Sequence, residues 1–273
     1  MGVDEHTIEV AGAAVFFRRA AAAGTETVYL HTVPTSADDW SELLALTGGI
    51  APDLPGFGRS SKAEHLDYSL AGYVTFLEEF LDALELPTVI LVGHGWGAAI
   101  ALLFAERHQD RVDRLAIIDA LPLLPGFTWP ASVRWLRRPG IGELMMGWLS
   151  RRMLARVLRR ASATAAAWPE DRVTPIWEQF DQGTQRVILR LLRSVNPRSL
   201  AAAGLDLGTL ERPVLVVWGE RDPWLDPSFA DAYARVLSGA TVETVADAGH
   251  WPWLDRPELT ARLAAFVAGS PAP

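Results

Sequence analysis

Cysteine is absent from this chain, and so are a long apolar run and a basic leader segment. Without cysteine there is no disulfide, no thiolate nucleophile and no cysteine-ligated metal. No apolar stretch reaches the roughly 18 residues that a membrane span needs, and no basic segment followed by an apolar one opens the sequence. We therefore expect a cytoplasmic protein without stable membrane association.

Lysine is scarce as well: Lys62 is the only lysine among the 25 lysine and arginine residues. The 33 acidic residues give a formal net charge of −8 at pH 7. Phosphate binding needs a basic face, so nucleic acid is not expected as a partner. The preference for arginine, together with many alanines, is typical of a GC-rich bacterial genome. We expect a small-molecule substrate as the partner, and a monomer or homodimer.

Apolar side chains are abundant, at 49% of the chain. Short apolar runs alternate with helical segments over residues 1–120 and again from residue 211, which indicates βαβ units and a parallel sheet. Residues 121–210 lack strand signals and are helical and rich in arginine and tryptophan, as expected for a lid inserted between two strands. The sequence predicts an α/β core over residues 1–120 and 211–273, with a mostly parallel doubly wound sheet, and a helical cap over residues 121–210.

A side chain is missing where a strand–turn–helix pattern usually carries chemistry. Residues 89–97 read VILVGHGWG, an apolar strand that turns through glycines into a helix. In the G-x-S-x-G layout the middle residue holds a nucleophile at the top of the turn, and here that residue is Gly95. Gly95 also fits a plain tight turn with positive φ, or an inactivating substitution made for crystallography. We favour the natural loss of a nucleophile.

Three acid–base residues follow predicted strands: Asp119, Asp222 and His250. In a doubly wound sheet, sites form where loops leave the carboxyl ends of the strands. A His acts as a base near neutral pH when a carboxylate fixes its tautomer and stabilises the imidazolium. Asp222 is the predicted partner of His250, and Asp119 is a second candidate that touches the substrate or tunes the site.

Four segments resemble motifs of one family. HTVPTSADDW (31–40) resembles the HGxP…W loop of the α/β-hydrolase superfamily, and DLPGFGRSSK (53–62) resembles its D-x-P-G-x-G-x-S loop. GHGWG (93–97) resembles GHDWG, and DAGHWPWLDRPE (247–258) resembles the segment of the catalytic His. The likeness is strongest to the epoxide hydrolase and haloalkane dehalogenase branch. It covers nearly the whole chain and implies the α/β-hydrolase fold.

The resemblance also implies roles for the matching residues. Gly95 stands where the family has a nucleophilic Asp, or Ser in the esterases, and His250 matches the general base. Asp222 matches the acid after the seventh strand, whereas Asp119 stands where some dehalogenases place their acid.

The oxyanion hole and the pocket follow from the same likeness. The backbone N–H groups of Val33 and Trp96 match the oxyanion hole, and Thr32 departs from the family's Gly in that loop. The missing side chain at Gly95 is expected to open volume that a substrate fills. His31 also fits a structural role, in which its ring bonds the backbone. The candidate pocket residues are His31, Trp129, Trp148, Trp224 and Trp251.

Residues 145–163 form an arginine-rich segment, MMGWLSRRMLARVLRRASA. Such a segment fits a helix on a membrane surface. It also fits a cap helix whose Met, Trp and Leu side chains face the pocket, and we favour this second interpretation.

Together these features predict an enzyme without a covalent intermediate. His250 and Asp222 would act as general acid and base on a hydrophobic, for example polycyclic, small molecule in natural-product biosynthesis. Cyclisation, C–C bond formation or cleavage, elimination and epoxide opening suit such a site. One alternative is an epoxide or ester hydrolase in which His250 activates a water above Gly95, and another is a non-catalytic binding protein. No metal-ligand spacing, phosphate loop or dinucleotide fingerprint is present, so no cofactor or metal is expected.

Overall fold

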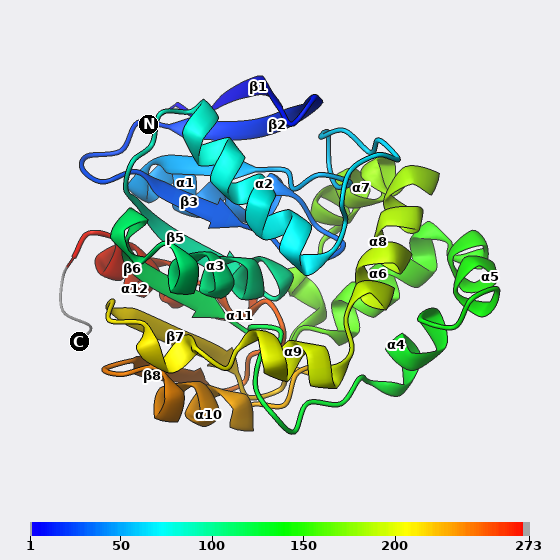
Figure 1. Cartoon of the computed structure of the whole chain (residues 1–273). Coiled ribbons are helices and arrows are strands. Elements are labelled where there is room, and N and C mark those ends of the chain that lie inside the picture. Colours follow the sequence, from blue (N-terminus) through cyan, green and yellow to red (C-terminus); the bar gives the residue numbers. More distant parts are fainter. Residues whose placement is uncertain (1, 270–273) are drawn as a thin grey trace.

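Eight short runs form the strands of a single sheet in the computed structural model, which describes residues 2–269 (Figure 1). The strands are β1 (Asp4–Val10), β2 (Ala13–Ala20), β3 (Thr27–Leu30), β4 (Gly49–Pro52), β5 (Val89–His94), β6 (Val112–Ile118), β7 (Val214–Gly219) and β8 (Thr241–Val245). Their order in the sheet is β1-β2-β4-β3-β5-β6-β7-β8. The β1–β2 and β2–β4 pairs are antiparallel, and the other pairs are parallel. The predicted mostly parallel sheet of an α/β-hydrolase fold is confirmed.

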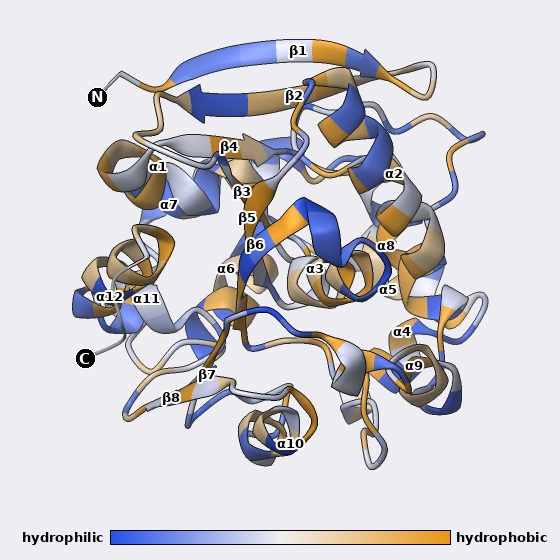
Figure 2. Cartoon of the chain, turned by 60° about the vertical axis from the view of Figure 1, so that its left-hand side comes forward, coloured by the Kyte–Doolittle hydropathy of each residue, from blue (hydrophilic) through white to orange (hydrophobic). Residues whose placement is uncertain are grey.

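Helices cover both faces of this sheet. Outside the insert they are α1 (Ser41–Thr47), α2 (Leu70–Ala83), α3 (Trp96–Arg107), α10 (Ser228–Val236), α11 (Pro252–Asp255) and α12 (Glu258–Val267). Figure 2 shows α1 and α12 on one side of the sheet, and α2 and α3 on the other. Every residue of β5 and of β7 is consequently buried, which explains why both strands are continuous apolar runs.

The boundaries of α2 illustrate how local chemistry limits a helix. Ser69 caps its start, since the side chain accepts a hydrogen bond from the N–H of Gly72 at 3.1 Å. Glu85 follows the helix with a φ of 56°, a left-handed conformation that stops it before Pro87. Helix α2 is thus limited to residues 70–83, between Ser69 and Glu85.

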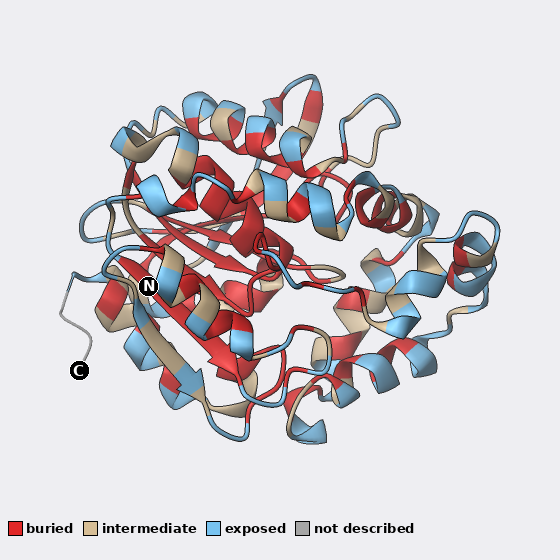
Figure 3. Cartoon of the chain, turned by 60° about the horizontal axis from the view of Figure 1, so that its bottom comes forward, coloured by how far each residue is buried: buried red, intermediate tan, exposed pale blue. Residues whose placement is uncertain are grey.

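Between β6 and β7, residues 121–210 form helices joined by loops and contain no strand. The α-helices are α4 (Ala131–Leu136), α5 (Ile141–Trp148), α6 (Arg151–Arg160), α7 (Glu170–Gln179), α8 (Gln182–Ser194) and α9 (Pro197–Ala203). Helices α4 to α8 lie beyond the carboxyl ends of the parallel strands, on the right in Figure 1, and α9 leads back toward β7. Figure 3 shows exposed outer faces on these helices around the buried central strands. The division of the chain into a core and a separate cap domain stays a prediction.

No helix within residues 2–269 combines the length and the apolar character needed to cross a bilayer. The cytoplasmic location stays a prediction.

Candidate active site

The turn between β5 and α3 is a one-residue reversal at Gly95. Strand β5 ends at His94, α3 begins at Trp96, and Gly95 between them has φ 52° and ψ −109°. Such a φ is strained for residues with a Cβ, so glycine relaxes the turn. The backbone at this point has the strand–turn–helix layout that the sequence predicted.

The glycines that flank the turn allow the end of β3 to pack against the start of α3. A Cβ at Gly97 would lie 2.2 Å from the carbonyl oxygen of Leu30, and one at Gly93 would lie 2.6 Å from the Cα of Ala98. No side chain fits at either distance. This close approach brings the loop after β3 directly against Gly95.

His250 and Asp222 form a buried hydrogen-bonded pair. The His250 Nδ1 lies 2.6 Å from Asp222 Oδ2, and both side chains are almost fully buried. The other carboxylate oxygen, Oδ1, accepts the backbone N–H groups of Trp224 at 2.8 Å and Leu225 at 3.1 Å. With Asp222 held on both oxygens, the ring presents Nε2 toward Gly95, and Nε2 lies 3.5 Å from the position that a Cβ of residue 95 would take.

Asp119 lies beside this pair but makes a different bond. Its Oδ1 accepts the N–H of Gly219 at 3.0 Å. Burial, and next the charge of Asp222, raise the pKa of Asp119 well above its usual value. The raised pKa favours the protonated form of Asp119, and the structure pairs His250 with Asp222 rather than with Asp119.

These three residues are also the one group within residues 2–269 whose ligand atoms are close enough for a metal ion, all within 4.8 Å of one another. His250 Nδ1 and Asp222 Oδ2 are already joined by a hydrogen bond, and burial raises the pKa of Asp119. A cation would have to displace the proton shared by His250 and Asp222, so the arrangement fits an acid–base set better than a cation site.

Thr32 occupies the space that a side chain at position 95 would need. A Cβ built on Gly95 would lie 2.1 Å from Thr32 Oγ1 and 2.8 Å from Thr32 Cβ. Thr32 is 2% exposed. The expectation that the missing side chain leaves open volume for a substrate is wrong, because a side chain from the neighbouring loop fills it. The sequence signal for this filled space was Thr32 itself, which stands where the family resemblance implies a Gly.

The same hydroxyl also changes the predicted oxyanion hole. The backbone N–H of Trp96 donates to Thr32 Oγ1 at 3.2 Å, so this N–H is already engaged. The N–H of Val33 takes part in none of the hydrogen bonds found among the described residues. The oxyanion hole of Val33 and Trp96 stays a prediction, with the Trp96 amide engaged and the Val33 amide unpaired among residues 2–269.

Aromatic rings surround His250. The centroids of Trp224 and Trp251 each lie 4.9 Å from that of His250, and both rings are oriented edge-on to it. Trp129 stacks on Trp96 with centroids 6.3 Å apart, which places it on the elbow side of the site. His250 is only 4% exposed, so the site is closed to solvent.

Two candidate pocket residues do not fit that role. Trp148 ends α5 and is 76% exposed, so it does not line the closed site. His31 bonds the backbone with both ring nitrogens: Nδ1 donates to the carbonyl oxygen of Thr32 at 2.8 Å, and Nε2 accepts the N–H of Leu54 at 2.9 Å. Burial lowers the pKa of His31 and keeps the ring neutral. Its role is structural.

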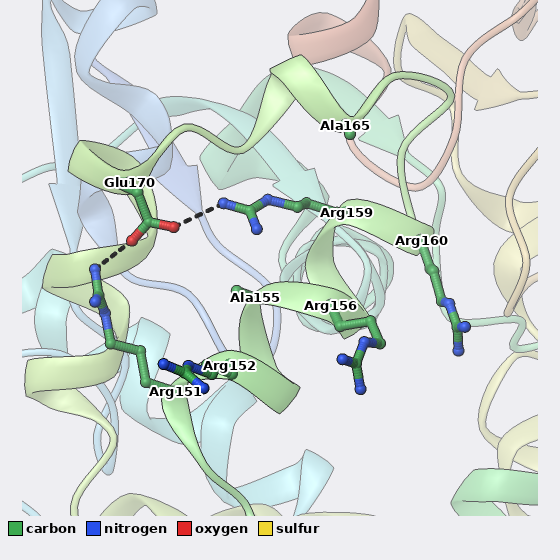
Figure 4. A pocket seen from close by; sticks show the side chains of 8 residues that line it. All are labelled: Arg151, Arg152, Ala155, Arg156, Arg159, Arg160, Ala165 and Glu170. Atoms are coloured by element: carbon green, nitrogen blue, oxygen red, sulfur yellow. Dashed lines mark hydrogen bonds and ion pairs between the residues drawn. The ribbon is translucent and has the colours of Figure 1, made fainter.

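The arginine-rich segment also differs from expectation. Only part of its apolar set faces inward: Leu154 and Leu158 are buried, whereas Met153 and Val157 are each 44% exposed. The arginines of α6 line an open cleft of about 470 Å³ beside Glu170, which pairs with Arg151 and Arg159 (Figure 4). The lining of this cleft includes none of the acid–base residues.

Asp39 is a buried acid near the site that the sequence analysis missed. It accepts a hydrogen bond from the indole N–H of Trp251 at 3.2 Å, and Trp251 in turn packs against His250. Burial raises the pKa of Asp39 to about 7. Asp38 and Asp39 are adjacent within the HTVPTSADDW motif, and nothing local in the sequence distinguishes the buried one.

Comparison with known proteins places the chain in a family. The alpha/beta hydrolase fold family matches residues 28–257. A haloalkane dehalogenase from Mesorhizobium japonicum is 32% identical over 51% of this chain and 48% of its own length, so the match spans about half of that relative. Epoxide hydrolase A from Mycobacterium tuberculosis is 27% identical over 88% of this chain and 85% of its own length.

A solved structure agrees with the fold. The haloalkane dehalogenase DbeA from Bradyrhizobium elkani superposes with a TM-score of 0.85 over 98% of each chain, at 24% identity, which is a likeness of fold. The family match runs from β3 through the elbow to the segment after His250. The chain therefore belongs to the alpha/beta hydrolase fold family, with haloalkane dehalogenases and epoxide hydrolases among its relatives.

Proposed function

We propose that this chain is an enzyme in which His250 and Asp222 perform acid–base catalysis on a small hydrophobic molecule, with no covalent intermediate at position 95. One contrast within the site carries the proposal. The base and its orienting acid are joined at 2.6 Å. The position within reach of the base, Gly95, has no side chain, and Thr32 fills its space.

The packing of Thr32 supports a natural loss of the nucleophile. With Oγ1 only 2.1 Å from the Cβ position of residue 95, Thr32 and any side chain at Gly95 exclude each other. An active parent with a nucleophile at position 95 would need a smaller residue at position 32. A single inactivating substitution at position 95 would have left that smaller residue in place, so the observed pair fits a chain changed at both positions.

The proposed chemistry needs only proton transfers. His250 Nε2 takes a proton from the substrate, while Asp222 holds the ring and stabilises the imidazolium. The imidazolium then returns the proton to another substrate atom. The free N–H of Val33 donates to the substrate oxygen on which negative charge develops. Cyclisation, C–C bond formation or cleavage, elimination and epoxide opening in natural-product biosynthesis suit this scheme.

The test compares wild type with His250→Ala, each incubated with metabolite extract from the source organism and analysed by mass spectrometry. We expect a product that forms with wild type and falls by about 10²- to 10⁴-fold in the variant. A product of unchanged mass, or of two joined or split fragments, fits a cyclase or lyase. Identical profiles for the two proteins would contradict the proposal and favour a non-catalytic binding protein.

Hydrolysis is the second candidate function, and the relatives favour it, since one of them is named an epoxide hydrolase. In this version His250 activates a water that attacks the substrate directly. Thr32 fills the space above Gly95, so the water would stand on the substrate side of His250 instead. A His250-dependent product heavier by one water, with no ester trapped on the protein, would select this candidate.

A further inference from the structure

We propose that the Thr32 hydroxyl is a catalytic group of this site, which donates a hydrogen bond to the substrate oxygen on which negative charge develops. The proposal rests on the proposed acid–base function of His250. In this proposal the Thr32 hydroxyl lies beside His250, at the position that a side chain of residue 95 would take. It also serves as the oxyanion donor in place of the Trp96 amide, which is bonded to it.

The backbone holds Thr32 rigidly. Its carbonyl oxygen accepts three hydrogen bonds: from the N–H of Thr35 at 3.1 Å, from the Thr35 hydroxyl at 3.0 Å and from Nδ1 of His31 at 2.8 Å. A β-branched side chain on such a backbone has few rotamers available. The hydroxyl is therefore held in place before a substrate arrives, which is the condition for stabilising a transition state.

The hydrogen-bond inventory leaves one donor free. Thr32 Oγ1 accepts the N–H of Trp96 at 3.2 Å, and a hydroxyl carries one proton of its own to donate. No hydrogen bond among the described residues uses that proton. The bond accepted from Trp96 polarises the hydroxyl and strengthens it as a donor. The Thr32 hydroxyl can therefore donate to a substrate oxygen that the Trp96 N–H, already bonded to Oγ1, does not contact.

The free donor and the free base converge on one place. Thr32 Oγ1 lies 2.1 Å, and His250 Nε2 lies 3.5 Å, from the same point, the Cβ position of residue 95. A substrate that gives a proton to His250 therefore has the Thr32 hydroxyl within reach of the charge that remains. A hydrogen bond there strengthens as the proton leaves, so it acts on the transition state more than on the bound substrate.

The test uses Thr32→Val, which keeps the branched shape without the hydroxyl, and Thr32→Ser, which keeps the hydroxyl. Both are compared with wild type and His250→Ala by the initial rate of formation of the His250-dependent product from the same metabolite extract. We expect Thr32→Val to lose about 10²- to 10³-fold and Thr32→Ser to stay within about tenfold of wild type. Near-UV circular dichroism of the tryptophans checks that each variant is folded.

The outcomes separate this inference from the function on which it rests. A rate in Thr32→Val equal to wild type, while His250→Ala is inactive, would overturn the role of the hydroxyl and leave the proposed function standing. Equal losses in Thr32→Val and Thr32→Ser would also overturn it, because they would indicate a packing role. An unaltered profile in His250→Ala would refute the proposed function itself, and this inference with it.

Discussion

At the scale of single residues, the site separates two carboxylates that look alike in the sequence. Asp222 accepts from His250 and from two backbone amides, whereas Asp119 accepts from one amide, and burial and the charge of Asp222 raise its pKa. The environment, rather than the residue type, decides which acid is charged. Only Asp222 has the contacts of an orienting acid.

Asn substitutions at these two positions test that assignment. Asp222→Asn removes the charge that stabilises the imidazolium, so we expect a loss of about 10²- to 10⁴-fold in the rate of the His250-dependent reaction. Asp119→Asn keeps an acceptor for the N–H of Gly219 and leaves the bond between His250 and Asp222 intact, so we expect a rate within about tenfold of wild type. Equal losses for the two variants would show that the assignment is wrong.

Asp39 predicts a pH dependence of stability. Its folded pKa of about 7 lies above the value of roughly 3.9 in an unfolded chain. The folded state therefore retains a proton that the unfolded chain releases, and this group's contribution falls as pH rises from about 4 to 7, by up to about 1.4 kcal/mol per pH unit. Stability from this group is greatest below the unfolded pKa.

Asp39→Asn removes this titration while keeping an acceptor for the Trp251 indole. We expect the stability of the variant relative to wild type to increase across that pH window, measured by urea unfolding at several pH values. Asp110→Asn, at an exposed carboxylate, serves as the control. If the free energies of unfolding of Asp39→Asn and wild type change with pH in parallel, the raised pKa of Asp39 is ruled out.

At the scale of elements, the site depends on the contact between the loop after β3 and the turn before α3. Gly97 allows the backbones to approach, and Thr32 then lies against Gly95. Positions 32 and 95 therefore act as one steric unit, although they belong to different elements. A side chain fits at one of them only if the other is small.

A double-mutant cycle measures the coupling free energy between positions 32 and 95. In the wild-type background, Gly95→Ala places a Cβ against Thr32, and we expect a loss of about 1–3 kcal/mol in the free energy of unfolding. In a Thr32→Gly background the clash is absent, and the same substitution costs only the strain of its positive φ, about 1 kcal/mol. Urea unfolding of the four proteins gives the coupling. Additive effects would show that the two positions are independent.

At the scale of the whole molecule, the helical segment of residues 121–210 is hydrogen-bonded directly to the loop that carries His250. The backbone N–H of His250 donates to the carbonyl oxygen of Ala161, just after α6, at 2.7 Å. Asp255 bonds both sides of this contact: its carboxylate accepts the N–H groups of Ala163, Thr164 and Gly249. Movement of this part of the insert is therefore coupled to the position of His250.

Asp255→Ala tests that coupling. Loss of the bonds to a charged acceptor removes more than about 1.4 kcal/mol from this contact, which is a tenfold change in local opening. We expect backbone amides near residues 163, 164 and 249 to exchange hydrogen at least about tenfold faster, measured by hydrogen–deuterium exchange. Amides of β5 should be unaffected, and Asp110→Ala should change neither group. Unchanged exchange near residue 163 would mean that other contacts hold the insert.

Much of this molecule is readable from local patterns. The apolar runs of β5 and β7, the glycine turn at Gly95 and the chain order of elbow, acid and His depend on residues close in sequence or on their order. Hydrophobic periodicity acts over a few residues, so a sequence suffices to predict a parallel sheet, and the resemblance of short motifs implies the α/β-hydrolase fold and the candidate acid–base residues. Helix ends are harder to predict from such patterns, because they depend on single residues such as the cap Ser69.

Other features were decided only by tertiary packing. The partner of His250 among two acids, the exposure of Trp148 and the burial of Asp39 each depend on how distant segments meet. The clearest case is Thr32, which bonds to Trp96 across 64 positions and fills the space at the elbow. A sequence shows that Gly95 lacks a side chain. Whether its space is empty depends on close packing between elements, because only a folded interior brings a neighbour within contact distance.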